Sequence, residues 1–134
     1  MFTWLYGDRE RLPQPVIEDL LFLHDKVTSW RTKQGDYHSV ASDRGFLTEH
    51  SAPCLHKKRV DLYKEYSMEG FQFRIALEVE TSTIENGYND LLKIMQLLKS
   101  DEVDFGLILF IQNNRSSRPK LSVSQLSSLV TGLN

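Results

Sequence analysis

Apolar and polar residues alternate along the segment FQFRIALEVE, which spans Phe71–Glu80. A two-residue period is typical of a strand that packs one face against a core. The segment KKRVDLYKEY alternates in the same way, with Val60 and Leu62 on one side, and SMEG between the two segments indicates a turn. We therefore expect an antiparallel hairpin, because a short turn joins the two strands.

Two other segments carry apolar residues at helical spacing. One helix is predicted over residues 15–31, and another of about three turns over YNDLLKIMQLLKS. The run VDFGLILFIQ is short and nearly all apolar, which is typical of a strand covered on both faces. A strand, a helix and a buried strand form a crossover unit, so 71–80 and 105–112 are expected to lie parallel. The predicted sheet is therefore mixed.

The remaining segments have weaker patterns. Residues 32–56 lack a clear period and are rich in turn residues, which predicts a loop. The tail NNRSSRPK is predicted to be a basic linker, followed by a weak terminal helix over LSVSQLSSLVTGLN. The segment Met1–Tyr6 is expected to be an edge strand or part of an interface. The predicted fold class is α/β (α+β), a mixed central β-sheet flanked by helices in a single domain spanning 1–134.

Composition restricts the class of protein more than it identifies a partner. With 40% hydrophobic and 25% charged residues, the 134-residue chain fits an ordinary folded domain rather than a disordered or fibrous one. A net charge of -2 gives no bulk support to nucleic-acid binding, so any basic surface must be local. Cys54 is the only cysteine, which excludes an internal disulfide and favours a reducing, cytoplasmic setting. No apolar run approaches the roughly 18 residues of a membrane helix, so no membrane partner is expected.

The alternation in the hairpin also places three acidic residues. Glu78 and Glu80 fall on the face opposite the apolar one, at the end of their strand, and Asp61 lies on the partner strand. Three converging carboxylates repel one another unless a cation lies between them, and Mg²⁺ is a hard ion that takes oxygen ligands. Such an ion can activate a water for cleavage of a phosphodiester. The alternative is that Glu78 and Glu80 form the solvated face of an edge strand.

The order of these segments resembles a known enzyme family. RVDLYK, a turn, IALEVE, a helix and GLILFI together resemble the catalytic core of the PD-(D/E)xK nuclease superfamily over residues 57–112. The E-x-E ending, in place of E-x-K, is similar to that of type II restriction endonucleases of the BamHI and BglII type. The resemblance implies that Asp61 and Glu78 are catalytic metal ligands for Mg²⁺, with Mn²⁺ as a substitute. It implies that Glu80 is a catalytic residue that acts on the attacking water or on a metal.

The resemblance raises two further sets of candidates. Some family members carry the missing lysine on the following helix, where this chain has Lys93. Leu91, Met95 and Leu98 define the expected buried face of that helix, so Lys93 is predicted to be solvated. Other members use an extra acid from the preceding segment. The candidates for this acid are Glu49, Asp43 and Glu18.

A nuclease also needs contacts to phosphate, which come from Lys and Arg side chains. Two basic clusters flank the predicted acidic corner, although such runs are more often ordinary solvated flanks. Family members that cut both strands usually act as dimers, and this chain has room for one active centre, so the resemblance implies a homodimer. The candidate DNA-binding residues are Lys57, Lys58, Arg59, Arg115, Arg118 and Lys120.

The function that the resemblance implies is that of a Mg²⁺-dependent endonuclease, which hydrolyses phosphodiester bonds of double-stranded DNA in the manner of type II restriction enzymes. One alternative is a non-catalytic nucleic-acid-binding or interaction module that retains the nuclease fold. Another is a repair or mobile-element nuclease with little sequence specificity, which the small size of the chain favours. Because Glu78 is expected to point away from the core, Glu78→Ala is predicted to abolish cleavage and leave the fold intact.

Overall fold

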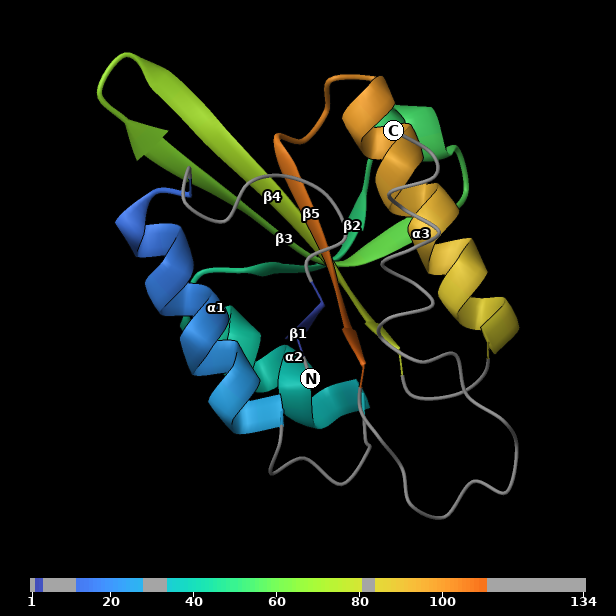
Figure 1. Cartoon of the computed structure of the whole chain (residues 1–134), viewed down its shortest axis with the longest axis horizontal. Coiled ribbons are helices and arrows are strands. Elements are labelled where there is room, and N and C mark those ends of the chain that lie inside the picture. Colours follow the sequence, from blue (N-terminus) through green and yellow to red (C-terminus); the bar gives the residue numbers. More distant parts are fainter. Residues whose placement is uncertain (1, 4–11, 28–33, 81–83, 111–134) are drawn as a thin grey trace.

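Among the described residues, five strands form one sheet, and helices lie on both of its faces (Figure 1). The computed structural model describes residues 2–3, 12–27, 34–80 and 84–110. The elements are β1 (Phe2–Thr3), α1 (Gln14–Val27), α2 (Gln34–Asp43), β2 (Leu47–Ser51), the 3₁₀ turn η2 (Pro53–Leu55), β3 (Arg59–Met68), β4 (Phe71–Glu80), α3 (Ile84–Lys99) and β5 (Phe105–Phe110).

The strands of the described sheet are ordered β1-β5-β4-β3-β2. β3 and β4 form the antiparallel hairpin that the alternating pattern predicts, and the pairing of Leu62 with Leu77 fixes its register. Gly70 in the turn has a φ of 85°, a left-handed conformation that glycine adopts without strain. The prediction of the hairpin is confirmed.

The crossover prediction is also confirmed, because α3 connects β4 to β5 and these two strands are parallel. Glu78 pairs with Ile108 in this ladder. β1 pairs with β5 in antiparallel orientation at one edge, which agrees with the edge strand expected near the N-terminus. The fold is therefore α+β with a mixed sheet.

The prediction of a loop over 32–56 is wrong for the described residues of that range. They form α2, β2 and η2, and β2 pairs with β3 at the other edge of the sheet. The sequence of α2 has no regular apolar stripe, but Tyr37 and Ala41 lie four residues apart and are both buried. Packing of this one pair against the core is a tertiary interaction that a sequence pattern does not reveal.

The helices bury both faces of the sheet (Figure 1). α1 and α2 pack on one face, in a cluster that includes Leu23 and Leu77. α3 packs on the other face, against Ala76 and Ile108 among others. β4 is thus an inner strand covered on both sides. The alternative that its acidic residues form a solvated edge is therefore wrong.

Asp19 anchors α1 to β3. Its carboxylate accepts hydrogen bonds from Lys64 Nζ at 2.7 Å, Tyr66 Oη at 2.6 Å and Arg44 Nε at 3.0 Å. Burial acts to raise the pKa of Asp19, but the bonds from Lys64, Tyr66 and Arg44 together hold it below its ordinary value. The ionised carboxylate therefore holds the first helix against the sheet.

α3 approaches the sheet closely at Gly106 of β5. A Cβ atom at this position would overlap the Cγ2 methyl group of Ile94, so only glycine allows the observed packing. Ile94 is fully buried, and it is preceded by Lys93 in the same turn of the helix. The close approach at Gly106 therefore determines how near the Lys93 side chain lies to β4.

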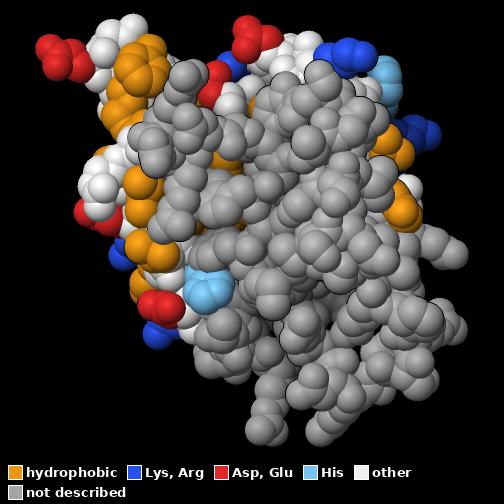
Figure 2. Space-filling view, in the orientation of Figure 1, with side chains coloured by type: hydrophobic (Ala, Val, Ile, Leu, Met, Phe, Trp, Pro, Cys, Tyr) orange, Lys and Arg blue, Asp and Glu red, His pale blue; other side chains and the backbone are white. Residues whose placement is uncertain are grey.

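Several predicted segments fall outside the described residues, namely the end of the helix predicted to reach residue 31, the linker NNRSSRPK and the terminal helix. No helix in the described part of the chain is long and apolar enough to cross a membrane. Leu21 on α1 and Phe71 near the hairpin turn are exposed by half or more. Figure 2 shows hydrophobic side chains along the margin formed by the hairpin and α1.

Candidate active site

The hairpin register brings Asp61 and Glu78 together. Leu62 pairs with Leu77, so the next position of the ladder places Asp61 beside Glu78. The carboxylate of Asp61 accepts a hydrogen bond from the backbone N–H of Val79 at 2.8 Å, and it is in hydrogen-bonding contact with the Glu78 carboxyl group. Two carboxyl groups in contact require a proton or a cation between them. This pair is the centre of the candidate site.

Glu78 is almost fully removed from water, with 1% of its surface exposed. Burial raises the pKa of Glu78 to about 9, and the contact with Asp61 and the charges of Asp61 and Asp90 act in the same direction. Lys93 opposes them, because its Nζ lies 2.7 Å from Glu78 Oε1. The expectation that Glu78 points away from the core is wrong, since α3 covers it.

Lys93 contradicts the prediction of a solvated side chain. Its side chain is 15% exposed, and its Nζ donates a hydrogen bond to the backbone oxygen of Arg59 at 2.8 Å in addition to the ion pair with Glu78. The buried stripe of α3 runs through Leu91, Ile94 and Leu97, so Lys93 flanks this stripe instead of lying opposite it. α3 therefore places the Lys93 ammonium group beside the Asp61–Glu78 pair.

The charge of Lys93 is stabilised by its surroundings. Burial acts to lower the pKa of Lys93, but the contact with Glu78 and the nearby charges of Glu78, Asp90 and Asp61 raise it above its ordinary value. Lys93 consequently carries a full positive charge at neutral pH. Its ammonium group joins β3 to β4 at the point where Asp61 and Glu78 meet.

The sequence suggests that Glu80 lies beside Asp61 and Glu78, but the acid that it contacts is Asp90. Glu80 lies at the end of β4, 8% exposed, and is hydrogen-bonded to Asp90 of α3. Burial, the hydrogen bond to Glu80 and the charge of Glu80 together raise the pKa of Asp90 to about 8. Sequence reasoning missed Asp90. The signal was its position three residues before Lys93, which places both residues on one face of the helix.

Glu49 lies across from Asp61 on β2, because the flanking pairs Thr48 with Leu62 and His50 with Val60 set the register. Its φ of 51° is a left-handed conformation that costs a non-glycine residue energy. Strain of this kind gathers at functional sites, so Glu49 remains a candidate for the extra acid. Of the other candidates, Asp43 and Glu18 are exposed residues of α2 and α1.

α2 also reaches this region. Burial raises the pKa of Tyr37 above its ordinary value, and the charges of Asp61, Glu49, Glu78 and Asp90 add to this effect. The neighbouring His38 has its Nε2 atom 3.6 Å from Glu49 Oε1. The Tyr37 phenol and the His38 imidazole therefore lie on the side of the acidic residues nearest α2.

The predicted basic residues divide into two groups. Lys57, Lys58 and Arg59 are exposed and lie directly before Asp61 in the chain, at the start of β3. They can supply phosphate contacts close to the acidic pair. Arg115, Arg118 and Lys120 lie outside the described residues.

The donor chemistry of the acidic pair fits Mg²⁺. In the described ranges, no three His, Cys, Asp or Glu side chains are placed so that they could enclose a metal ion. Mg²⁺ does not need such a cage, because proteins usually hold it through one or two carboxylates while it keeps several waters. Asp61 and Glu78 provide two carboxylates in contact. They are the residues that would hold the ion.

Comparisons with protein-family models, with curated proteins and with solved structures found no match to this chain. The chemistry that the site can perform is therefore inferred from its own contacts. They consist of two adjoining acid pairs, Asp61 with Glu78 and Glu80 with Asp90, and one buried cation, Lys93.

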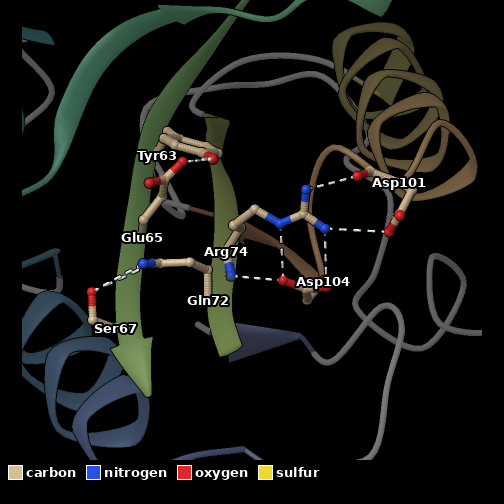
Figure 3. Close-up of polar contacts among 7 residues, drawn as sticks. All are labelled: Tyr63, Glu65, Ser67, Gln72, Arg74, Asp101 and Asp104. Carbon is tan, nitrogen blue, oxygen red and sulfur yellow. Dashed lines mark hydrogen bonds and ion pairs between the residues drawn. The ribbon is translucent and has the colours of Figure 1, made fainter. Parts of the chain in front are cut away.

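A second polar cluster lies on the same face of the hairpin, nearer the turn (Figure 3). The guanidinium group of Arg74 donates hydrogen bonds to Asp104 Oδ2 at 3.1 Å and to the backbone oxygen of Asp101 at 2.7 Å. Tyr63 donates to Glu65 at 2.7 Å beside a cavity of about 170 Å³. The Arg74 contacts tie β4 to the connection between α3 and β5. They hold the C-terminal end of α3 in place.

Proposed function

We propose that the chain is a metal-dependent endonuclease that hydrolyses phosphodiester bonds of double-stranded DNA, of the type II restriction type. One observation carries the proposal, namely the contact of the Asp61 and Glu78 carboxyl groups with the Lys93 ammonium group beside them. Acids from two antiparallel strands and a lysine from the crossover helix suit a reaction in which negative charge develops on a phosphate. The resemblance of residues 57–112 to PD-(D/E)xK nucleases supports the same function.

Asp61 and Glu78 bind the divalent cation in this proposal. When bound, Mg²⁺ would lower the pKa of a water and offset the charge that develops on the phosphate. The hydrogen bond from Val79 N–H fixes one oxygen of Asp61, so that this carboxylate is oriented before any ion arrives. The contact of Lys93 with Glu78 favours the ionised form of that acid, which is the form that binds a cation.

Lys93 replaces the lysine that most of the family carries two residues after the second acid. Glu80 occupies that position here, and Lys93 reaches Glu78 from α3 instead. Its ammonium group can stabilise the negative charge of the phosphate during attack. Glu80 then orients the attacking water or accepts its proton.

The exposed Lys57, Lys58 and Arg59 supply phosphate contacts that position the duplex. Cutting both strands requires two such sites, so we propose that the chain acts as a homodimer. The single free cysteine agrees with a cytoplasmic protein.

A non-catalytic module that binds nucleic acid is the second candidate. It is favoured by the observation that Glu78 already has Lys93 and Asp61 as partners and so does not depend on a metal for its neutralisation. A nuclease of low sequence specificity is a variant of the first candidate with the same chemistry.

Plasmid cleavage separates these functions. Wild-type protein is incubated with plasmid DNA in Mg²⁺, Mn²⁺ or EDTA, beside Glu78→Gln and the control Glu69→Gln, which lies in the exposed hairpin turn. Metal-dependent cutting that is lost in Glu78→Gln and kept in Glu69→Gln supports the nuclease. Discrete fragments indicate restriction, whereas a smear indicates low specificity. DNA binding without metal-dependent cutting supports the non-catalytic module.

A further inference from the structure

A cavity of about 170 Å³ lies between the hairpin and the C-terminal end of α3. It is lined by Tyr63 and Glu65 of β3, Arg74 of β4 and Glu102 after α3, and residues of β2 and η2 complete its wall. Figure 3 shows the side chains of the hairpin that face it. Glu65 follows Asp61 by four residues on β3, which is about 13 Å along a strand. The cavity is therefore separate from the acidic pair.

The charge of the cavity is negative. Arg74 contributes little to it, because the guanidinium group donates hydrogen bonds to both carboxylate oxygens of Asp104, at 3.1 and 3.2 Å. The same group donates to the backbone oxygen of Asp101 at 2.7 Å and to its Oδ1 at 3.2 Å. Most of its N–H donors are thus occupied, and its charge is neutralised by two aspartates. Glu65 and Glu102 then determine that the cavity suits a cation and not an anion.

Both glutamates have room for a ligand. Glu65 Oε1 accepts a hydrogen bond from Tyr63 Oη at 2.7 Å, and Glu102 Oε2 accepts one from the backbone N–H of Cys54 at 3.2 Å. Within the described ranges, the second oxygen of each carboxylate has no hydrogen bond or ion pair. An ionised carboxylate only accepts hydrogen bonds, so the group that completes these two must donate them.

The other lining residues favour a flat cation. The rings of His50 and Tyr63 are stacked, with centroids 4.0 Å apart and an interplanar angle of 7°, and both line the cavity. Burial lowers the pKa of His50 below its ordinary value, so the imidazole is neutral at pH 7 and does not repel a cation. Leu97 adds a buried apolar wall. A guanidinium group is planar, stacks on aromatic rings and donates to carboxylates in a fork, whereas an ammonium group is a point charge.

We propose that this cavity binds an alkylguanidinium group, which donates N–H bonds to Glu65 and Glu102 and packs its alkyl stem on Leu97. A cavity of about 150 Å³ accommodates one benzene ring, so the volume fits a guanidinium group with a short stem and is too small for a nucleotide. The group can belong to a free small molecule or to the arginine side chain of a peptide. The site uses no residue of the acidic pair, so it does not depend on the proposed function.

Binding is measured by NMR of the aromatic ring signals of His50 and Tyr63 while the full chain is titrated with ethylguanidinium at pH 7 in EDTA. N-ethylurea has the same shape without the charge and is the ligand control. We expect saturable shifts with ethylguanidinium and none with N-ethylurea. Glu65→Gln and Glu102→Gln should each weaken binding about tenfold, because a charge-assisted hydrogen bond is lost. The control Glu69→Gln, in the exposed hairpin turn, should bind as the wild type does.

A third ligand, N-acetylarginine amide, separates the two sources of the group. Binding at least as tight as that of ethylguanidinium indicates an arginine side chain of a peptide, and weaker binding indicates a free small molecule. No saturable shift in the wild type, equal binding of N-ethylurea, or unchanged affinity in both glutamine variants overturns the proposal. None of these measurements involves DNA or a metal ion, so failure of the proposed function leaves their outcome unchanged.

Discussion

Lys93 Nζ lies 2.7 Å from Glu78 Oε1, and both side chains are largely withdrawn from water. The Asp61–Glu78 pair holds one proton and one negative charge at neutral pH, and Lys93 compensates that charge, because an unpaired charge out of water is costly. The Lys93–Glu78 contact also joins α3 to the inner strand β4. It is therefore both a structural contact and the feature that places a cation beside the acidic pair.

Lys93→Met should abolish cleavage and destabilise the fold. Removing the Lys93 cation leaves the negative charge of the Asp61–Glu78 pair without its partner, which costs about 3–5 kcal/mol. Urea unfolding at pH 7 measures the loss, with Lys99→Met in the exposed last turn of α3 as the control. Combining Lys93→Met with Glu78→Gln should cost little more than Lys93→Met alone at pH 7, because Glu78 already holds its proton there. Equal stability of the Lys93→Met and Lys99→Met variants would contradict a buried pair.

The same pair changes what is expected of Glu78→Ala. The sequence predicts a variant with an intact fold, but Glu78 is buried and its loss leaves the Lys93 charge without this partner. We now expect Glu78→Ala to be less stable than Glu78→Gln, whose amide fills the same space. Thermal unfolding of the two variants measures the difference. Equal melting temperatures would indicate that Lys93 finds another partner.

In EDTA, the protein should lose stability as the pH rises from 5 to 9. Glu78 holds its proton to about pH 9 when folded, against 4.5 as its ordinary pKa, and Asp90 holds its proton to about pH 8, against 3.8. The folded state therefore binds more protons than the unfolded state across this window, so the free energy of unfolding falls as the pH rises. Asp19, whose pKa is lowered, contributes in the opposite direction only below about pH 4.

Urea unfolding at several pH values measures this dependence. The slope should be smaller in Glu78→Gln, which has no proton to lose at that position. Saturating Mg²⁺ should also reduce the slope in the wild-type protein, because a bound cation replaces the proton. A wild-type stability in EDTA that is constant or rising between pH 5 and pH 9 would contradict the raised pKa values.

Gly106→Ala should disturb the site from a distance. The added Cβ overlaps Ile94, so α3 must move away from β5, at a cost of about 1–3 kcal/mol. Because Lys93 precedes Ile94, the shift should also lengthen the contact with Glu78 and lower cleavage. Ile94→Ala in the same chain makes room for the new methyl group. The double variant should therefore be less impaired than the sum of the two single variants, which a double-mutant cycle of unfolding free energies tests.

The local patterns of the sequence were sufficient for the hairpin and the crossover. A two-residue period and an apolar run depend only on neighbouring residues, so β3, β4, α3 and β5 could be predicted from them. α2 could not, because it is held by the burial of Tyr37 and Ala41 against distant elements. A pattern shows which residues are apolar and not which surfaces meet.

The candidate site, like the fold, could be predicted from the sequence only in part. The strand order predicts that Asp61 and Glu78 approach each other, since antiparallel register follows from the hairpin. The orientation of Lys93 was predicted wrongly because the apolar residues of α3 allow two stripes, and only the packing of Ile94 on Gly106 selects one. Asp90 could not be recognised without that choice. The burial of Glu78 likewise depends on α3, which covers the face that alternation assigns to water.

Binding of a divalent cation by the Asp61–Glu78 pair is tested most directly by titrating the free protein with Mn²⁺ and recording the free ion by electron paramagnetic resonance. The variants Asp61→Asn and Glu78→Gln are measured beside the control Glu69→Gln. We predict that the wild-type and control proteins bind Mn²⁺ alike, that Mg²⁺ competes, and that both site variants bind at least about tenfold more weakly. Equal Mn²⁺ affinity in all four proteins, or no binding by the wild type, would contradict the account.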